Sequence, residues 1–163
     1  MVKTIFGFVL LFMSHQGVAM DLNEYKGKVV LVANIATRCG YTGQLDGLEK
    51  IYQKFKDKGL VVLGVPSNDF GSQTPENNDE VKKFCKLKYG VSFPLTPKMI
   101  VKGPQKDPLF KFLTNTESGE KEIGWNFEKF LVDRSGKLVN RFSSKVEPED
   151  DQLIAALNAA LSN

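Results

Sequence analysis

The stretch Lys28–Phe55, KVVLVANIATRCGYTGQLDGLEKIYQKF, decides how the first part of this 163-residue chain folds. It opens with an unbroken apolar run, which predicts a buried strand over Val29–Asn34. It closes with apolar residues at helical spacing, which predict a helix from about Gln44 to Lys58. Cys39 lies between the two. A thiol at such a junction is either a reactive group or a small buried residue that suits a turn.

Strands and helices are predicted to alternate along the rest of the chain. The predicted elements are a strand (Leu60–Val65), a helix (Asn78–Tyr89), a strand (Leu95–Val101), a short helix (Pro108–Leu113), a β-hairpin turning at Asp133–Gly136, and a last helix that begins at Pro148 and carries Leu153, Leu157 and Leu161 as its core stripe. This order predicts an α/β protein with a central mixed β-sheet flanked by helices, which is a thioredoxin-like fold. Its site is expected at the carboxyl ends of the parallel strands, where the loop holding Cys39 would lie.

Composition and charge exclude several classes of function. The formal net charge of +3 comes from 22 basic and 19 acidic residues that are mixed along the chain, which indicates a solvated surface and no nucleic-acid partner. One histidine and two cysteines cannot build a conventional zinc site. No P-loop or GxGxxG stretch is present either. We therefore expect no metal and no cofactor.

The first residues of the chain have the pattern of a secretory signal. Lys3 precedes an apolar run, Ile5–Met13, which is too short to span a membrane, and Ala19 supplies a small residue at the cleavage position. We interpret residues 1–19 as a signal peptide and residues 20–163 as one domain, periplasmic or secreted. In the alternative interpretation the apolar run is an N-terminal strand of the fold, in a hairpin, and the protein is cytoplasmic.

Cys39 has the surroundings of a reactive thiol. The unsatisfied N–H groups at a helix N-terminus stabilise a thiolate, and Arg38 beside it adds a positive charge. Position 42 is Thr, so the chain lacks the second cysteine of a Cys-x-x-Cys motif, and Thr42 is expected to help cap the helix. Packing remains the alternative role for Cys39, because free cysteine is among the most buried residue types.

Three polar side chains and a second cysteine could complete a site with Cys39. Gln73 lies in a Gly- and Pro-containing loop after a strand, and Trp125, the only tryptophan, precedes Asn126 at the start of another strand. Their amide and indole N–H groups are donors that can hold a sulfur anion. Each could instead serve packing or a turn. Cys85 lies on a predicted helix, where a buried core position is the alternative.

Four segments resemble the glutathione peroxidase family in their order and spacing. They are KGKVVLVANIATRCGYT (26–42), LVVLGVPSNDFGSQTP (60–75), FCKLKYGVSFPL (84–95) and GWNFEKFLVDRSGKLVNRF (124–142). The resemblance runs from about Asp21 to the end of the chain. It implies a cysteine-containing member in which Cys39 is the peroxidatic residue, and in which Gln73, Trp125 and Asn126 complete the catalytic tetrad.

The resemblance also implies how the enzyme is reduced. Cys85 matches the resolving cysteine of non-selenium members that draw electrons from thioredoxin. The family's Pro-Cys-Asn-Gln-Phe reads PSNDF at Pro66–Phe70, which leaves Cys39 and Cys85 as the only possible intramolecular disulfide. The family's Gln-Glu-Pro reads Gln73-Thr74-Pro75, which alters the hydrogen bonding of that loop. The segment before Trp125 lacks the insertion that tetrameric members use, which favours a monomer with a protein reductant.

The implied function is that of a thiol peroxidase. Cys39 would reduce hydrogen peroxide or an organic hydroperoxide and become a sulfenic acid, Cys85 would convert this to a disulfide, and a thioredoxin-type protein or glutathione would reduce it. If Cys85 is folded inside its helix, its segment must unwind in each cycle. The alternative function is a thiol redox relay or peroxide sensor that passes oxidation to a partner protein. A peroxiredoxin would carry Thr where Ala36 stands.

Overall fold

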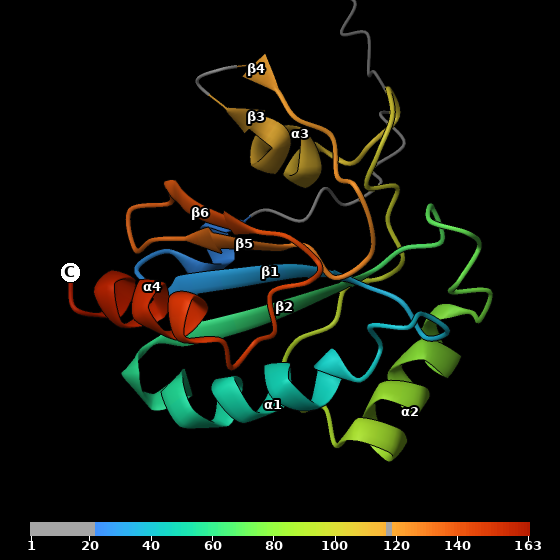
Figure 1. Ribbon diagram of the computed structural model, residues 1–163, viewed down its shortest axis with the longest axis horizontal. Coiled ribbons are helices and arrows are strands. Elements are labelled where there is room, and N and C mark those ends of the chain that lie inside the picture. Colours follow the sequence, from blue (N-terminus) through green and yellow to red (C-terminus); the bar gives the residue numbers. More distant parts are fainter. Residues whose placement is uncertain (1–21, 117–118) are drawn as a thin grey trace, which may run out of the picture.

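The computed structural model describes residues 22–116 and 119–163. The predicted signal peptide, and the N-terminal strand that is its alternative, lie outside these residues. The described part is built on a four-stranded sheet with the order β2–β1–β5–β6 (Figure 1). Its strands are β1 (Val29–Ile35), β2 (Leu60–Pro66), β5 (Lys129–Val132) and β6 (Leu138–Phe142). Strand β2 is parallel to β1, and β5 is antiparallel to both β1 and β6, so the sheet is mixed.

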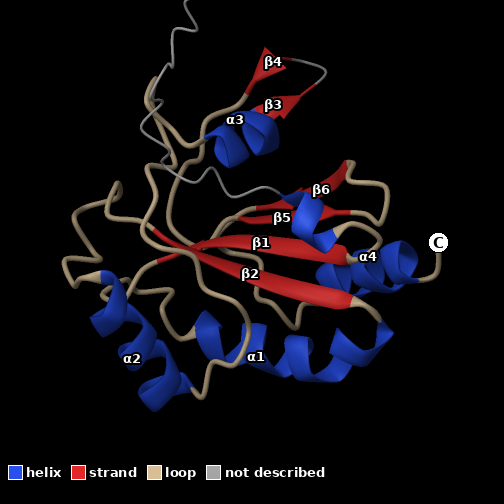
Figure 2. Cartoon of the chain, turned by 180° about the vertical axis from the view of Figure 1, so that it is seen from behind, coloured by secondary structure: helices blue, strands red, loops and turns tan. Residues whose placement is uncertain are grey.

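Helices cover both faces of the sheet (Figure 2). The helices are α1 (Gln44–Phe55), α2 (Asn78–Tyr89), α3 (Pro108–Thr114) and α4 (Asp151–Leu161), with 3-10 turns η1 (Leu22–Tyr25) and η2 (Lys56–Lys58) and a separate pair of short strands, β3 (Asn115–Thr116) and β4 (Gly119–Glu120). The predicted first helix therefore ends at Phe55, and its last three residues form η2. In the described part of the chain, no helix has both the length and the apolar character needed to cross a bilayer.

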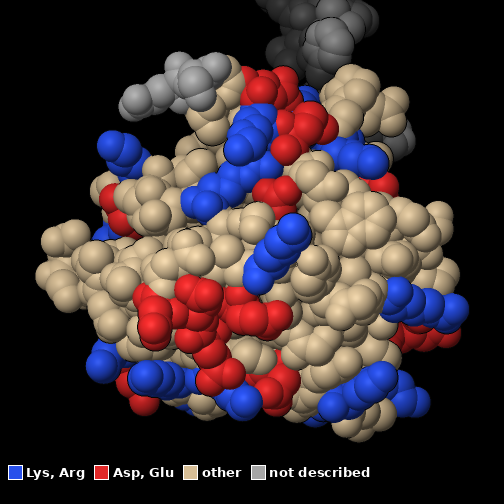
Figure 3. Space-filling model, in the orientation of Figure 1, with Lys and Arg blue, Asp and Glu red and all other residues tan. Residues whose placement is uncertain are grey.

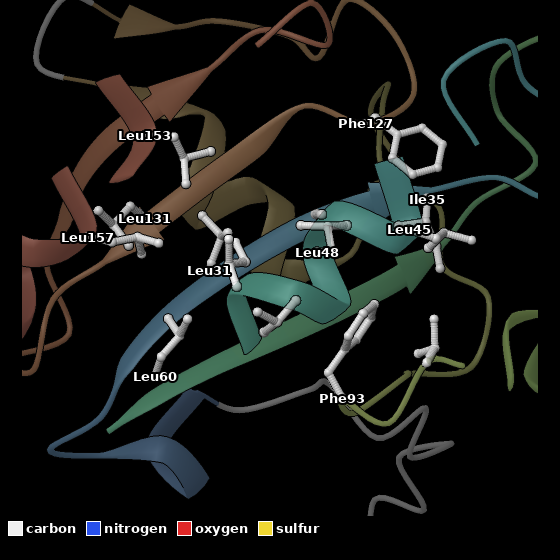
Figure 4. Close-up of a cluster of buried hydrophobic side chains, with 14 of the residues drawn as sticks. Leu31, Ile35, Leu45, Leu48, Leu60, Phe93, Phe127, Leu131, Leu153 and Leu157 are labelled. Atoms are coloured by element: carbon white, nitrogen blue, oxygen red, sulfur yellow. The ribbon is translucent and has the colours of Figure 1, made fainter. Parts of the chain in front are cut away.

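Strand β1 is buried on both faces, which explains its unbroken apolar sequence. Leu31 and Ile35 face the core formed with α1, α2 and α4, part of which Figure 4 shows, whereas Val30 and Val32 face the core formed with α3. The expected α/β arrangement, a central mixed sheet flanked by helices, is confirmed.

The predicted strand over Leu95–Val101 is wrong. Only Leu95 pairs with the sheet, through a single parallel bridge to Gly64 at the edge of β2. The bridge rests on two bonds, from Gly64 N to Pro94 O and from Thr96 N to Gly64 O, each 3.0 Å. The next ladder bond would need the N–H of residue 66 in β2, which is proline and has none, and Pro66 O instead accepts a hydrogen bond from Met99 N at 3.0 Å.

The last helix begins at Asp151 and not at Pro148, which lies in the turn before it. The Asp150 carboxylate accepts a hydrogen bond from Gln152 N and caps the helix. Leu153 and Leu157 are buried as predicted. Leu161 is only half-buried, and Ala160 is buried at the third position in its place.

Candidate active site

The site lies where the two parallel strands end. Because Val29 pairs with Leu60 and Ile35 with Pro66, β1 and β2 run in register and stop together. The loops that follow them leave the sheet at the same end, on the right in Figure 1 and near α2. Cys39 lies in the first of these loops, in a turn just before α1, with a partly buried side chain.

The Cys39 turn is closed by Thr42. The Thr42 hydroxyl accepts a hydrogen bond from Cys39 N and donates one to Ala36 O, both 2.9 Å long. Tyr41 N lies 3.4 Å from Cys39 Sγ, so one backbone N–H points to the sulfur and would stabilise a thiolate. The prediction that Thr42 caps the helix is wrong. The N-cap of α1 is Gly43, which makes no side-chain hydrogen bond, and Thr42 instead shapes the turn that holds the thiol.

Gln73 and Asn126 are in direct contact. Asn126 Nδ2 donates a 3.0 Å hydrogen bond to Gln73 Oε1, and Asn126 is completely buried. Because this bond uses the Gln73 oxygen, the Gln73 Nε2 donors stay available. Within the described chain, neither Gln73 Nε2 nor Trp125 Nε1 donates to a protein acceptor. Asn126 Oδ1 is also buried without a protein partner. The pair therefore presents unused polar atoms that a bound substrate could engage.

Trp125 is held through its backbone while its ring stays partly open. Asn34 Nδ2 donates to Trp125 O at 3.0 Å, which ties the residue to the end of β1. The indole packs on Phe70 with ring centroids 5.6 Å apart and is 40% exposed. Trp125 and Asn126 lie in a turn before β5, and not at the start of that strand as predicted. Phe127 has a left-handed backbone (φ 64°), which is uncommon for a non-glycine residue and turns the chain there.

Glu76, which was not among the predicted site residues, joins the two loops. Its carboxylate accepts hydrogen bonds from Thr37 Oγ1 (2.6 Å) and Arg38 Nε (2.8 Å). The backbone oxygen of Gln73 accepts from Arg38 N and Thr37 Oγ1 as well, at 2.9 and 3.2 Å. These bonds fix the Gln73 loop to the two residues directly before Cys39. They also direct the Arg38 side chain to Glu76. The sequence had led us to expect the Arg38 charge beside the Cys39 thiol instead.

The Glu76 carboxylate carries its charge in the folded protein. Burial by itself would raise the pKa of Glu76. The hydrogen bonds from Thr37 and Arg38 and the positive charge of Arg38 outweigh that effect, and the pKa lies below its usual value. One signal in the sequence could have indicated this residue, because the chain lacks the Glu of Gln-Glu-Pro but has a carboxylate two residues further on.

Cys85 is a core residue of α2 in this structure. It is completely buried, in the same core cluster as Val81, and it is not bonded to Cys39. Burial raises the pKa of the Cys85 thiol to about 11. The thiol is therefore protonated and shielded from solvent as long as α2 keeps this conformation.

A buried lysine supports the start of α1, and sequence reasoning missed it. Lys129 is completely buried, and its Nζ donates to Gln44 Oε1 (2.6 Å) and Val146 O (2.5 Å). Gln44 in turn donates to Ser144 O at 2.7 Å. Burial lowers the pKa of Lys129 to about 8, although the negative charges of Glu147 and Glu128 act in the opposite direction.

No group of three His, Cys, Asp or Glu side chains within residues 22–116 and 119–163 is placed so as to hold a metal ion. The site offers the Cys39 thiol, the Tyr41 N–H directed to its sulfur, and the unused donors of Gln73 and Trp125. A mixed sheet of this type, with a cysteine in the loop after its first parallel strand, defines a thiol-based oxidoreductase with a thioredoxin-like fold.

Comparison with known proteins specifies the family. The family model named "Glutathione peroxidase" matches residues 8–114. The glutathione peroxidase homolog BsaA of Staphylococcus aureus (strain MW2) is 46% identical over 148 residues, which cover 90% of this chain and 92% of that protein. The hydroperoxy fatty acid reductase of Synechocystis is 45% identical over 156 residues, covering 91% of each. The chain therefore belongs to the glutathione peroxidase family and is an oxidoreductase, a peroxidase of the glutathione peroxidase type.

Solved structures agree with this assignment. The crystal structure of Trgpx in its apo form superposes with a TM-score of 0.69 at 39% identity, covering 88% of this chain and 87% of that one. The crystal structure of T. cruzi GPX1 gives the same TM-score at 33% identity, covering 88% of each chain. A thiol:disulfide interchange protein of Chlorobium tepidum, with a TM-score of 0.60 at 19% identity, covering 86% of this chain and 84% of that one, shares the fold alone.

Proposed function

We propose that Cys39 is the peroxidatic residue and that Gln73, Trp125 and Asn126 assist it. The Cys39 thiolate attacks the terminal oxygen of the peroxide, so an S–O bond forms as the O–O bond breaks. The released hydroxide or alkoxide takes a proton and leaves as water or an alcohol, and Cys39 becomes a sulfenic acid.

The unused donors around the Gln73–Asn126 bond are the observation that carries this proposal. In the transition state, negative charge leaves the sulfur and develops on the departing oxygen. Gln73 Nε2 and the Trp125 indole N–H have no protein acceptor in the described chain, so both can donate to that charge. Because Asn126 holds the amide of Gln73, little reorganisation is needed when the reaction occurs.

We assign the resolving role to Cys85. Its thiol condenses with the sulfenic acid, which releases water and forms a Cys39–Cys85 disulfide. A disulfide requires Cα atoms about 4.4 to 6.8 Å apart and an accessible thiol, whereas Cys85 is completely buried within α2. The segment around Cys85 therefore has to unwind. The start of α2 is capped by Asn77 and Glu80 and its end by Gly90, whose N–H donates to Cys85 O and Lys86 O, and we expect the C-terminal cap to be the one that opens because it holds Cys85 itself.

Organic hydroperoxides fit the surroundings of the site better than hydrogen peroxide alone. A shallow groove of about 530 Å³ is lined by Tyr41, Trp125, Ser143 and Lys145, among others. The Synechocystis relative is by its name a reductase of hydroperoxy fatty acids. We propose that this chain accepts such substrates too, with the apolar part of the molecule against the exposed Trp125 ring.

Peroxide-dependent NADPH consumption tests the mechanism. The assay is run with thioredoxin and thioredoxin reductase, and separately with glutathione and glutathione reductase, on the wild type, Cys39→Ser and Cys85→Ser. We expect Cys39→Ser to be inactive with both reductants and Cys85→Ser to lose the thioredoxin-dependent reaction. Full activity in Cys39→Ser would refute the mechanism, and unchanged thioredoxin-dependent turnover in Cys85→Ser would remove the resolving role.

The same assay separates the enzyme from a redox relay. Rapid turnover with thioredoxin and peroxide supports peroxide reduction as the function. Slow turnover together with a stable mixed disulfide to one protein would support the relay.

We also propose that the protein is a monomer and that it is exported after cleavage of residues 1–19. Gel filtration of the purified protein measures the first, and N-terminal sequencing after expression with the native leader measures the second. A chain that begins at Met20 supports export, and a chain that retains residues 1–19 supports the N-terminal strand.

A further inference from the structure

We propose that the exposed side of α2 around Cys85 is the docking surface for an acidic protein dithiol, which reduces the Cys39–Cys85 disulfide. We call this surface the α2 lysine face. It consists of Lys82, Lys83, Lys86, Leu87 and Lys88. The inference rests on the resolving role proposed for Cys85 and adds where its reductant binds and what charge that reductant carries.

An exposed leucine lies at the centre of the α2 lysine face. Leu87 is 73% exposed, more than any other large hydrophobic residue in the described chain. It comes two residues after the buried Cys85, and the lysines around it are all exposed. Figure 3, which has the orientation of Figure 1, shows several Lys and Arg side chains at the lower right, where α2 lies, with Asp or Glu side chains beside one of them. A projecting apolar side chain within a basic rim has the composition of a protein contact surface.

The lysines of this face are only partly balanced by acidic residues, since α2 carries two carboxylates, Asp79 and Glu80, against four lysines. Lys82, Lys83 and Lys86 form none of the ion pairs of the described chain, and Lys88 lies over the rings of Phe84 and Tyr89. Like charges at helical spacing, as in Lys82 and Lys86, destabilise a helix. Asp79, four residues before Lys83, offsets part of this cost, but the four lysines of α2 outnumber its two carboxylates and leave a net positive charge that an acidic partner would neutralise.

The face stays beside Cys85 when α2 unwinds. Each of its residues lies within three positions of Cys85 in the sequence. In the helix Cys85 is buried in the core while these side chains are exposed, but once the segment unwinds they lie within three residues of the sulfur that is attacked. Charge of this kind accelerates the encounter with an oppositely charged protein, and the acceleration falls as salt is added.

The exchange runs in two steps. One thiolate of the docked dithiol attacks the Cys85 sulfur, which forms a mixed disulfide and releases the Cys39 thiolate. The second thiol of the partner, as a thiolate, then attacks the partner's first sulfur, which is bonded to Cys85 in the mixed disulfide. This releases the Cys85 thiolate, which takes a proton, and the partner, having donated two electrons to the peroxidase, leaves as an intramolecular disulfide.

The test compares a protein reductant with a small one. The purified protein is oxidised with one equivalent of hydrogen peroxide, and the disulfide is verified by mass spectrometry. The second-order rate constants for its reduction by a reduced bacterial thioredoxin of net negative charge and by dithiothreitol are then measured at low and high salt. The variants are Lys83→Glu/Lys86→Glu and Leu87→Ala. The control, Lys111→Glu/Lys137→Glu, changes the net charge equally at exposed sites on α3 and on the β5–β6 turn.

We expect Lys83→Glu/Lys86→Glu to slow reduction by thioredoxin about tenfold or more and to flatten its salt dependence, since steering accounts for factors of about 10 to 1000. Leu87→Ala is expected to slow it several-fold, and dithiothreitol should act on all variants within a factor of about two. An equal loss with both reductants, or equal effects in variant and control, would overturn the proposal. So would a disulfide that dithiothreitol reduces and thioredoxin does not. If no disulfide forms, the resolving role of Cys85 fails instead.

Discussion

Asn126 and Gln73, 53 residues apart in the sequence, are joined by a hydrogen bond of 3.0 Å between their side-chain amides. The bond uses the Gln73 oxygen and leaves its N–H donors for the reaction. It also connects the turn before β5, which carries Asn126, to the loop after β2, which carries Gln73, so each segment fixes the position of the other.

Replacing Asn126 with alanine should lower the second-order rate constant for peroxide about 10- to 100-fold, because Gln73 loses the group that orients it. Stopped-flow measurement of Cys39 oxidation provides the rate. Asn140→Ala, at an exposed position on β6, is the matched control and should change little. Gln73→Ala combined with Asn126→Ala should cost less than the product of the single effects, since the pair acts as a unit. Strict additivity would show that the bond has no part in catalysis.

Glu76→Gln should slow Cys39 oxidation about 3- to 10-fold, as expected when one charge-assisted hydrogen bond is lost. The Thr37 hydroxyl can still donate to the amide oxygen, but Arg38 loses its ion partner. Glu76→Asp should recover part of the rate. If Glu76 acts only on stability, the unfolding midpoint in urea will shift while the rate constant stays at the wild-type value.

The lowered pKa of Glu76 predicts that the free energy of unfolding depends on pH. The pKa of Glu76 is lowered in the folded protein, so its contribution is fully present above the pKa of the unfolded chain and is lost as the pH falls through the folded value. Urea denaturation between about pH 6 and pH 3 should therefore show a steeper loss in the wild type than in Glu76→Gln, since the carboxyl pKa of an unfolded chain is about 4.3. Parallel curves would contradict the assignment.

Iodoacetamide should label Cys39 well before Cys85 in the native reduced protein. Cys85 is buried, and its pKa is raised to about 11, so it stays protonated at the pH of the experiment. Peptide mapping at pH 8 measures the order of labelling, and labelling in urea provides the reference in which both thiols react. Equal native rates would mean that α2 already opens freely without oxidation.

Lys129→Met should alter how stability changes at alkaline pH. Burial lowers the pKa of Lys129 to about 8, so between that value and the ordinary value of 10.5 the unfolded chain binds a proton that the folded chain does not. Stability of the wild type relative to Lys129→Met should then rise with pH over this window, by about 1 to 3 kcal/mol. A neutral amine keeps two N–H donors, enough for both Gln44 and Val146. Lys137→Met, at an exposed site, should show no such change.

The elements that carry strong local signals were predicted correctly. The apolar run of β1, the amphipathic helices α1 and α2, and the turn of the β5–β6 hairpin all follow from periodicity and turn chemistry. The strand expected over Leu95–Val101 failed because Pro94 and, on β2, Pro66 lack the N–H groups that would extend the ladder beyond the single bridge. The last helix starts later than expected because Asp150, and not Pro148, makes its cap.

The sequence by itself determined that this chain has a thiol at a strand-to-helix turn, and that Cys39, Gln73, Trp125, Asn126 and Cys85 are its candidate site residues. Their chemical type and spacing are local properties, readable without coordinates. Only the tertiary structure decided that Gln73 is held by Asn126, that Glu76 fastens the Gln73 loop beside Cys39, and that Lys129 is buried. Those relations join residues far apart along the chain, and they exist only once the packed sheet has brought its loops together.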